Sequence, residues 1–240
     1  MILLQLAIII PVYNPPKGWA THLLEQVHEF LKHTSESNVQ LVIVNDGSVN
    51  THCKDEINTI NQTHATALVV EYEKNNGKGF ALRKGVAATS ALYYIVTDVD
   101  FPYTTESILA VYKELQTGNC DIAAGNRNRD YYYRIHGFRK NLSLMLRYCI
   151  RKRLQLMTDD SQCGLKGFNE AGKQLFLQTQ INRYLYDLEF MIKASNSKAI
   201  RLKSVPVFLR SGIVLRSMPL HILLQETGNF FRILFFRNKL

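Results

Sequence analysis

The chain has 240 residues, 46% of them hydrophobic and 20% charged, which is enough to bury one sizeable core in one large α/β domain or two small ones. Its 4 cysteines show no CxxC spacing, which argues against a zinc site or a disulfide framework and is typical of reduced thiols in a cytosol. No stretch approaches the roughly 18 uninterrupted apolar residues of a membrane span, and no Lys or Arg precedes Lys17 as it would in a signal peptide.

The net charge of +9 is unevenly distributed along the chain. Residues 1–120 hold 8 Lys/Arg against 12 Asp/Glu, whereas residues 121–240 hold 21 Lys/Arg against 8 Asp/Glu. A basic second half indicates an anionic partner, which could be a phosphate, a nucleic acid or a lipid surface. An ordinary basic protein surface would give the same counts.

Strands and amphipathic helices alternate through the first half of the chain. Buried strands are predicted at residues 6–12, 41–46, 67–72, 93–98 and 120–125. Helices are predicted at residues 19–33, near 52–62, at 79–92 and near 104–117. The inward face of the first helix is expected to consist of Leu23, Leu24, Val27, Phe30 and Leu31. Apolar strands that alternate with helices predict a mostly parallel central sheet flanked by helices, and ligands of such sheets bind beyond the carboxyl ends of the strands.

The second half departs from this alternation. A helix is predicted near 140–157, with Leu146 in its apolar stripe and Arg147 on its basic face. Short strands and helices follow, and the last residues are apolar but interrupted by charges. The sequence therefore predicts one domain at 1–217 followed by an amphipathic tail at 218–240.

Two carboxylates, Asp98 and Asp100, stand two and four residues after Val96, where a run of β-formers ends. Such a pair is repulsive unless a divalent cation lies beside it. Mg²⁺ in proteins takes one or two carboxylates together with substrate phosphates. The pair therefore indicates a site for Mg²⁺ or Mn²⁺ and a diphosphate, although a solvated loop with two acids would show the same bare pattern.

Two loops that contain glycine suit other parts of a nucleotide. The segment "VNDGS" (44–48) ends a strand on Asp46, whose carboxylate suits a ribose hydroxyl or a base edge, or else forms a simple Asx turn. The segment "NNGKG" (75–79) places Lys78 between glycines at the start of a helix. It lacks the order of a Walker loop, yet it can present backbone N–H groups and one cation to a phosphate.

Taken in order, "PVYN", "NDGS", "NNGKGFAL", "TDVD", "GNR" and "DSQCGLK" resemble the motifs of family 2 glycosyltransferases with the GT-A (nucleotide-diphospho-sugar transferase) fold. Within this family the chain is most similar to the polyprenyl-phosphate branch, which includes dolichyl-phosphate glucosyl- and mannosyltransferases. The most specific part, "DSQCGLKGF" (160–168), is similar to the "DTQCGFK" signature of the glucosyl members, and "YLYDLEF" (184–190) to their "FDVEL" segment. The resemblance implies a nucleotide-sugar half at 1–125 and an acceptor half at 126–217.

The resemblance also implies a role for each matched residue. The residues expected to bind the nucleotide sugar are Pro11, Tyr13, Asn14, Asp46, Lys78, Asp98, Arg127 and Arg210. Asp98 and Asp100 match the family's DxD motif and are expected to hold the metal, with Asp100 in direct contact. Asp160 matches the acid that faces the acceptor, and it is the expected catalytic residue together with the neighbouring Gln162.

The resemblance leaves one role open between two residues, and the chain departs from the family pattern at one position. Arg216 competes with Arg210 as the late cation that closes on the diphosphate. Pro15 stands where the family usually has an acid after "PxYN", so the sequence leaves the base of the donor open between UDP and GDP.

The implied reaction is inverting transfer of a hexose, from UDP-glucose or GDP-mannose, to a polyprenyl phosphate. The second pKa of a monophosphate is about 6, so the acceptor phosphate is already largely in its doubly ionised form at neutral pH. Asp160 would then orient this acceptor rather than take its proton. The basic second half and the tail are expected to meet an anionic membrane surface on the cytoplasmic face. The tail could instead pack on the core or form a homodimer.

Two alternatives stay open at this point. One keeps the fold and replaces the lipid by a saccharide acceptor, as in polysaccharide synthesis. The other is a non-catalytic nucleic-acid-binding protein, based on the interleaved arginines and tyrosines of "RNRDYYYRIHGFRK" (127–140). The second alternative leaves the acids at the strand ends without a purpose, and nucleic acid is therefore not an expected partner.

Overall fold

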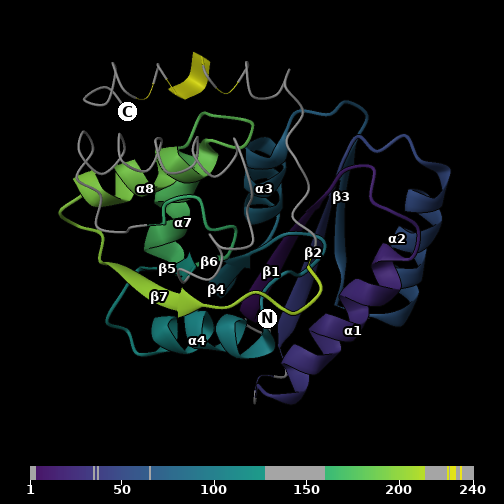
Figure 1. Ribbon diagram of the computed structural model, residues 1–240, viewed down its shortest axis with the longest axis horizontal. Coiled ribbons are helices and arrows are strands. Elements are labelled where there is room, and N and C mark those ends of the chain that lie inside the picture. Colours follow the sequence, from purple (N-terminus) through teal and green to yellow (C-terminus); the bar gives the residue numbers. More distant parts are fainter. Residues whose placement is uncertain are drawn as a thin grey trace.

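The computed structural model describes residues 4–34, 36, 38–64, 66–127, 160–213, 226, 228–230 and 233. Its strands are β1 (Leu4–Val12), β2 (Val39–Asp46), β3 (Leu68–Tyr72), β4 (Ala91–Val96), β5 (Ile122–Arg127), β6 (Lys166–Phe168) and β7 (Leu202–Val207). Its helices are α1 (Trp19–Lys32), α2 (Thr51–Thr63), α3 (Lys78–Ala87), α4 (Thr105–Gln116), α7 (Glu170–Leu177) and α8 (Tyr186–Asn196). Helices lie on both faces of one central sheet (Figure 1).

The strands of the described residues form a 7-stranded sheet in the order β3-β2-β1-β4-β6-β5-β7. Every neighbouring pair is parallel except those of β6, which runs antiparallel to both β4 and β5. Lys166 at the start of β6 pairs with Val96 of β4 and Ala124 of β5. Because β6 runs the other way, the segment that precedes it meets the carboxyl ends of β4 and β5.

Two hydrophobic layers hold the helices to the sheet. Successive side chains of a strand point to opposite faces. In β1, Ile8 therefore packs with α1, α2 and α4, whereas Ile9 packs with α3, α7 and α8. Both side chains are fully buried. The burial of both sheet faces explains why the strands read as continuous apolar runs.

The predicted mostly parallel sheet is confirmed, and the five predicted strands correspond, within two residues at either end, to β1 to β5. The predicted inward face of α1 is also buried, with Leu31 only partly covered. Several boundaries differ by a few residues, most of all between α3 and β4, because α3 ends at Ala87 rather than at residue 92 and β4 spans Ala91–Val96 rather than 93–98. Ala91 pairs with Leu4 of β1, and this pairing outweighs the helical preference of alanine and leucine.

Part of the predicted tail contacts the core. The Glu226 carboxylate accepts a hydrogen bond of 3.0 Å from the Leu185 amide, at the N-terminal end of α8. Ile233 is fully buried, and Phe230 packs against the cluster formed by α3, α7 and α8. The predicted helix near 140–157 lies outside the described residues. None of the helices described here is both long and apolar enough to cross a bilayer.

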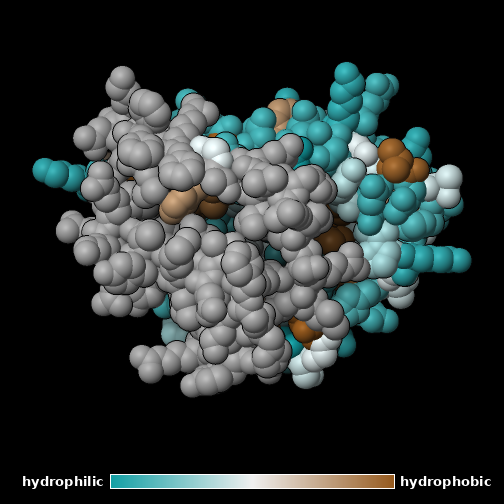
Figure 2. Space-filling model, turned by 45° about the horizontal axis from the view of Figure 1, so that its top comes forward, coloured by the Kyte–Doolittle hydropathy of each residue, from teal (hydrophilic) through white to brown (hydrophobic). Residues whose placement is uncertain are grey.

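Large hydrophobic side chains are exposed at scattered positions of the described surface. They are Tyr13, Val49, Leu92, Tyr184 and Phe208. These residues belong to different elements and loops. In the face that Figure 2 shows, the described surface is largely hydrophilic, with hydrophobic residues in separate spots. The described part of this face thus presents single apolar side chains, as ordinary protein surfaces do.

Candidate active site

Most of the polar residues singled out in the sequence lie at the carboxyl ends of the strands. Asp46 is the last residue of β2, and Arg127 is the last residue of β5. Asp98 follows β4 after one intervening residue, Thr97, and Asp100 lies two residues further along. The antiparallel β6 brings the segment Asp160–Gly164 to the same edge. The predicted location of the site is therefore the location where these residues gather.

Asp98 forms an ion pair with Lys78 across the site. The distance from Lys78 Nζ to Asp98 Oδ1 is 2.5 Å, and the lysine side chain is mostly buried. Burial alone would lower the pKa of Lys78, but the carboxylates of Asp98 and Asp187 outweigh it and raise the pKa above its ordinary value. Lys78 therefore carries a positive charge at the first turn of α3, as the "NNGKG" loop predicted.

The turn after Asp98 is held by its own backbone and by Arg210. Phe101 has a left-handed backbone (φ 44°), and its amide donates to the Asp98 carbonyl at 2.9 Å. Arg210 Nε donates to the Phe101 carbonyl and Arg210 Nη2 to the Asp100 carbonyl, each at 2.8 Å. Arg210 also contacts His22 Nε2 at 2.8 Å. The described contacts of Arg210 thus shape the turn, and Arg216 lies outside the described residues.

Asp100 lies in this turn with its side chain exposed. Partial desolvation and the neighbouring charge of Asp98 raise the pKa of Asp100 above its ordinary value. In the described part of the chain, no group of three or more His, Cys, Asp or Glu side chains could hold a metal on its own. The oxygens of Asp98 and Asp100 fit a hard divalent cation that takes its other ligands from substrate phosphates and water.

Arg127 and Asp160 form a two-pronged ion pair beside this turn. Arg127 Nε lies 2.6 Å from Asp160 Oδ2, and Nη2 lies 2.7 Å from Oδ1. The Arg127 amide donates to Asp160 Oδ2 as well, at 3.1 Å. Burial would lower the pKa of Arg127, but Asp160 raises it well above the ordinary value, so the pair stays ionised. Asp160 is only 2% exposed, and its buried carboxylate accepts three hydrogen bonds from Arg127.

The segment that carries Asp160 is joined directly to the turn after β4. The Tyr103 hydroxyl accepts from the Gly164 amide at 3.0 Å and from Cys163 Sγ at 3.3 Å. A Cβ on Gly164 would lie 2.6 Å from Asp98 Oδ2, which is closer than real Cβ contacts. Glycine at this position therefore lets the segment touch the Asp98 carboxylate. Gln162 lies in the same segment, half-buried.

Asp46 is bound to the "NNGKG" loop. Its carboxylate accepts from the amides of Asn76 at 2.8 Å and Gly77 at 2.9 Å, and from Asn75 Nδ2 at 2.8 Å. Gly47 has φ +70°, and a Cβ there would lie 2.7 Å from the Asn75 nitrogen. The two loops that the sequence singled out separately are thus one unit, in which Asp46 fixes the backbone before Lys78. Its predicted role toward base or ribose stays a prediction.

The loop after β1 is also fixed from neighbouring segments. Asn14 has a left-handed backbone (φ 43°), its amide donates to Ser48 Oγ at 3.0 Å, and its Oδ1 accepts from the Val49 amide at 2.9 Å. Pro11 lies within β1, while the Tyr13 ring is 51% exposed. The Tyr13 ring is therefore open for stacking on a ligand, whereas Asn14 serves the loop itself.

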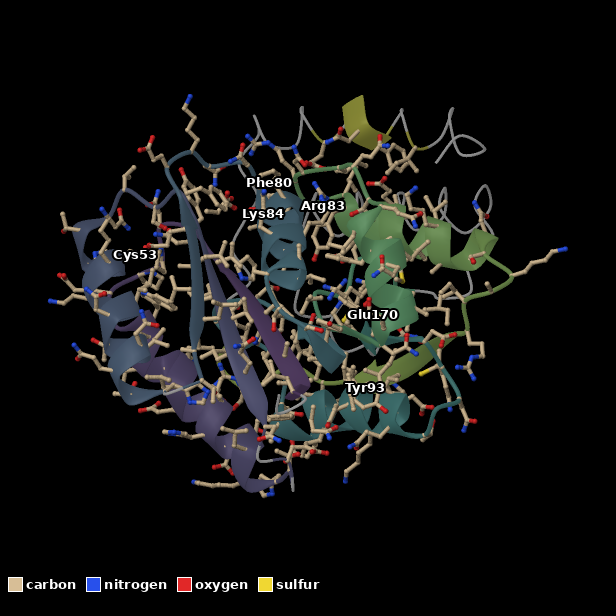
Figure 3. The ribbon with its side chains drawn as sticks, turned by 180° about the vertical axis from the view of Figure 1, so that it is seen from behind. Cys53, Phe80, Arg83, Lys84, Tyr93 and Glu170 are labelled. Carbon is tan, nitrogen blue, oxygen red and sulfur yellow. The ribbon has the colours of Figure 1, made fainter. Side chains whose placement is uncertain are left out.

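The start of α3 packs against the loop that leads to α8. Arg83 donates to Thr179 Oγ1 at 3.1 Å and to the Ile181 carbonyl at 2.9 Å. A Cβ on Gly79 would lie 2.5 Å from the same Ile181 carbonyl. Figure 3 shows Arg83 on α3, on the side of the sheet that α7 and α8 also cover. The start of α3, which follows the "NNGKG" loop, is thus held against the second half of the chain.

Two buried charged residues near the site were missed in the sequence. Lys166 is fully buried at the start of β6, and its Nζ lies 2.9 Å from Oδ1 of Asp187 in the first turn of α8. Both residues stand inside the quoted phrases "DSQCGLKGF" and "YLYDLEF". The sequence signal that could have revealed this pair is a lysine beside apolar residues in a strand, because a buried lysine is rare unless it is paired with an acid.

The sequence model described as "Glycosyl transferase family 2" matches residues 7–179 of the chain. A dolichyl-phosphate beta-glucosyltransferase of Saccharomyces cerevisiae is 24% identical over 224 residues, which are 84% of this chain and 66% of that protein. The Drosophila melanogaster protein of the same name is 26% identical over 217 residues, 81% of this chain and 64% of that one. The chain thus spans just under two thirds of the length of these relatives. The resemblance to this branch is confirmed.

Solved structures with the same fold include two synthases of glycosylated phosphoglycerates. Glucosyl-3-phosphoglycerate synthase from Mycobacterium tuberculosis, in complex with UDP, matches with a TM-score of 0.67 at 17% identity, covering 97% of this chain and 79% of that one. Mannosyl-3-phosphoglycerate synthase from Rubrobacter xylanophilus matches with a TM-score of 0.68 at 15% identity, covering 95% and 72%. Together with the sheet order, these neighbours confirm the predicted GT-A fold.

Proposed function

The chain belongs to glycosyl transferase family 2, and on that premise we propose that it moves a hexose from a nucleotide-diphosphate sugar to a polyprenyl phosphate. UDP-glucose is the favoured donor, because the relatives named above are dolichyl-phosphate beta-glucosyltransferases. The observation that carries the proposal is the meeting of two ion pairs, Lys78–Asp98 and Arg127–Asp160, at the carboxyl edge of the sheet. The cations of the two pairs, Lys78 and Arg127, can each face a phosphate group there.

The donor-side residues have distinct parts in this proposal. Asp98 and Asp100 would hold Mg²⁺ or Mn²⁺, which when bound neutralises charge on the diphosphate. Solved neighbours in complex with Mn²⁺ support a divalent ion. Lys78, fixed by Asp98, offers an ammonium to the same diphosphate, where charge develops as the nucleotide leaves. Tyr13 offers an exposed ring to the base.

The acceptor-side residues act by orientation. In an inverting transfer, a phosphate oxygen of the acceptor forms a bond to the anomeric carbon while the bond from that carbon to the nucleotide's terminal phosphate breaks. The acceptor monophosphate is already ionised at neutral pH, so no base has to remove a proton. Asp160, held by three hydrogen bonds from Arg127, would fix the guanidinium that faces the phosphates. Gln162 lies beside it.

The second half of the chain would bring the reaction to the membrane. We propose a donor half at 1–125, an acceptor half at 126–217 and a tail at 218–240, acting together on the cytoplasmic face of a membrane. The 21 Lys/Arg against 8 Asp/Glu of residues 121–240 support attraction to anionic headgroups. The contacts of Glu226 and Phe230 with the core support a tail that packs partly on the domain.

The test measures nucleotide release and sugar transfer with UDP-glucose and with GDP-mannose, each with and without a short polyprenyl phosphate, in Mn²⁺, Mg²⁺ or EDTA. Release that needs both a divalent ion and the lipid, from one donor, is the expected result and identifies the base. Lipid-independent transfer to an added saccharide would contradict the lipid acceptor while leaving the glycosyltransferase in place. Family membership favours either reading over a nucleic-acid-binding protein.

A further inference from the structure

Lys166 is a buried cation without a role in the proposed chemistry. Its Nζ lies 2.6 Å from the Cys163 carbonyl and 3.3 Å from the Ser161 carbonyl, besides its 2.9 Å contact with Asp187 Oδ1. The side chain is completely inaccessible to solvent. A buried ammonium is tolerated only where it is paired and hydrogen-bonded. Asp187 supplies the countercharge, and the two carbonyls supply further acceptors.

These two carbonyls belong to the segment Asp160–Gly164, which links both ion pairs of the site. At one end, Asp160 fixes Arg127. At the other end, Gly164 lies against Asp98. A shift of this segment would therefore move the acceptor-side guanidinium and the donor-side carboxylate at the same time.

The segment is fixed from two sides. Tyr103, which follows β4, accepts hydrogen bonds from Cys163 and Gly164. Lys166 binds the carbonyls on the other side of the same backbone and connects them to α8 through Asp187. No hydrogen bond within β6 would be lost if Lys166 carried an apolar side chain, because its own backbone pairs with β4 and β5 in either case.

We propose that Lys166 is a positioning residue, which holds the segment Asp160–Gly164 in register with Asp98 and Arg127, and that Asp187 is its counter-ion. The expected changes in kcat rest on the proposed function, whereas the expected changes in hydrogen exchange do not. Small displacements of positioned groups cost about 10²-fold in rate. Lys166→Met is therefore expected to lower kcat by about 10²-fold and, because Asp98 shifts with the segment, to weaken the affinity for UDP in the presence of Mn²⁺, measured by calorimetry.

A second buried lysine provides the matched control. Lys173 in α7 donates to the Thr89 carbonyl at 3.0 Å and to the Tyr94 hydroxyl at 2.9 Å, and its backbone belongs to a different element. Lys173→Met also removes a buried ammonium and is expected to lower stability without lowering kcat. Equal losses of kcat in the two lysine variants would overturn the proposal, because both would then act through stability.

Two variants of Asp187 separate the charge from the positioning. Lys166→Met with Asp187→Asn removes both buried charges, so stability is expected to recover while kcat stays low, since the carbonyls still lack their donor. Recovery of kcat in this double variant would overturn the proposal. Asp187→Asn alone keeps Lys166 on the carbonyls, so its loss of kcat should be smaller than that of Lys166→Met. An equal loss of kcat would show that the Asp187 carboxylate, and not the contact of Lys166 with the carbonyls, causes the effect, and it would also overturn the proposal.

Hydrogen exchange tests the same idea without any turnover. The amides of Cys163 and Gly164 donate to the Asp160 carbonyl and to Tyr103. In Lys166→Met, and in the double variant, they should exchange faster, while amides of β4 stay protected; unchanged exchange would contradict the positioning role. If the wild-type chain transfers sugar to no polyprenyl phosphate, the proposed function fails, and the exchange result still decides the role of Lys166.

Discussion

Asp160 and Asp121 make the same kind of ion pair near opposite ends of β5. Asp121 accepts from Arg201 Nε at 3.0 Å, from Nη2 at 2.9 Å and from the Arg201 amide at 2.9 Å. This contact pattern repeats that of Asp160 with Arg127. Of these two acids, only Asp160 lies at the carboxyl edge of the sheet. The same substitution at the two positions therefore separates an effect on catalysis from the loss of stability that follows when such an ion pair is broken.

Asp160→Asn is expected to slow transfer to a polyprenyl phosphate by less than about 10³-fold, because an ionised phosphate needs no general base. It should also lower the free energy of unfolding by about 3 kcal/mol, since the buried Arg127 loses its countercharge. Transfer kinetics and urea unfolding measure the two effects. Asp121→Asn is the control and should leave kcat unchanged. A loss well beyond 10³-fold for Asp160→Asn would favour a hydroxyl acceptor instead.

At the scale of elements, the close approach of the segment Asp160–Gly164 to the turn after β4 leaves no room for a side chain at Gly164. Gly164→Ala forces the Asp98 carboxylate away from a position 2.6 Å from the new Cβ, which strains its pair with Lys78. We expect the affinity for UDP in the presence of Mn²⁺ to fall about tenfold or more, measured by calorimetry.

The control for this variant is Gly228→Ala, because a Cβ at Gly228 meets no atom of the described part of the chain within 4 Å. Its affinity for UDP should equal that of the wild type. Wild-type affinity in Gly164→Ala would mean that Asp98 can move without loss and would contradict the importance of this contact.

The contact of Glu226 with the start of α8 predicts a pH dependence of stability. Burial raises the pKa of Glu226 above its ordinary value, although hydrogen bonds from the amides of Leu185 and Tyr184 act in the opposite direction. The folded state therefore binds this proton more tightly than the unfolded state. The resulting stabilisation is present below the unfolded pKa and is lost as pH rises through the folded pKa.

Glu226→Gln keeps an oxygen that can accept from Leu185 but cannot ionise. Relative to the wild type, the variant should gain stability at about pH 7 and lose this advantage at about pH 4. Thermal unfolding at the two pH values measures the difference. An advantage that grows toward low pH would contradict the direction of the shift.

At the scale of the whole molecule, the uneven charge predicts electrostatic binding to membranes. The intact chain is expected to float with anionic vesicles and to bind neutral vesicles far less. Each Lys or Arg near the surface contributes about 1 kcal/mol, screened by salt. Binding should therefore fall steeply as the salt concentration rises. Equal flotation with neutral and anionic vesicles would contradict the predicted role of the basic second half.

The elements of the first half could be predicted from the sequence because each one has a local pattern. Continuous apolar runs indicate β1 to β5, helical spacing of apolar residues indicates the helices between them, and the two acids after β4 interrupt an otherwise apolar segment. The antiparallel insertion of β6 had no such signal, because three residues are too short for a period. The bond network around Asp46 and the pair of Lys166 with Asp187 depend on long-range contacts, which no local pattern contains.

The place of β6 in the sheet has a consequence for how the chain is made. β4 can pair with β1 on one side as soon as it is made, but its other neighbour, β6, follows only at residues 166–168, and both neighbours of β5 come later in the chain than β5 itself. Until then each strand has an open edge, and open edges pair with other chains. A fragment that stops after β5 would therefore be prone to aggregation, and the growing polypeptide would benefit from a chaperone at this stage.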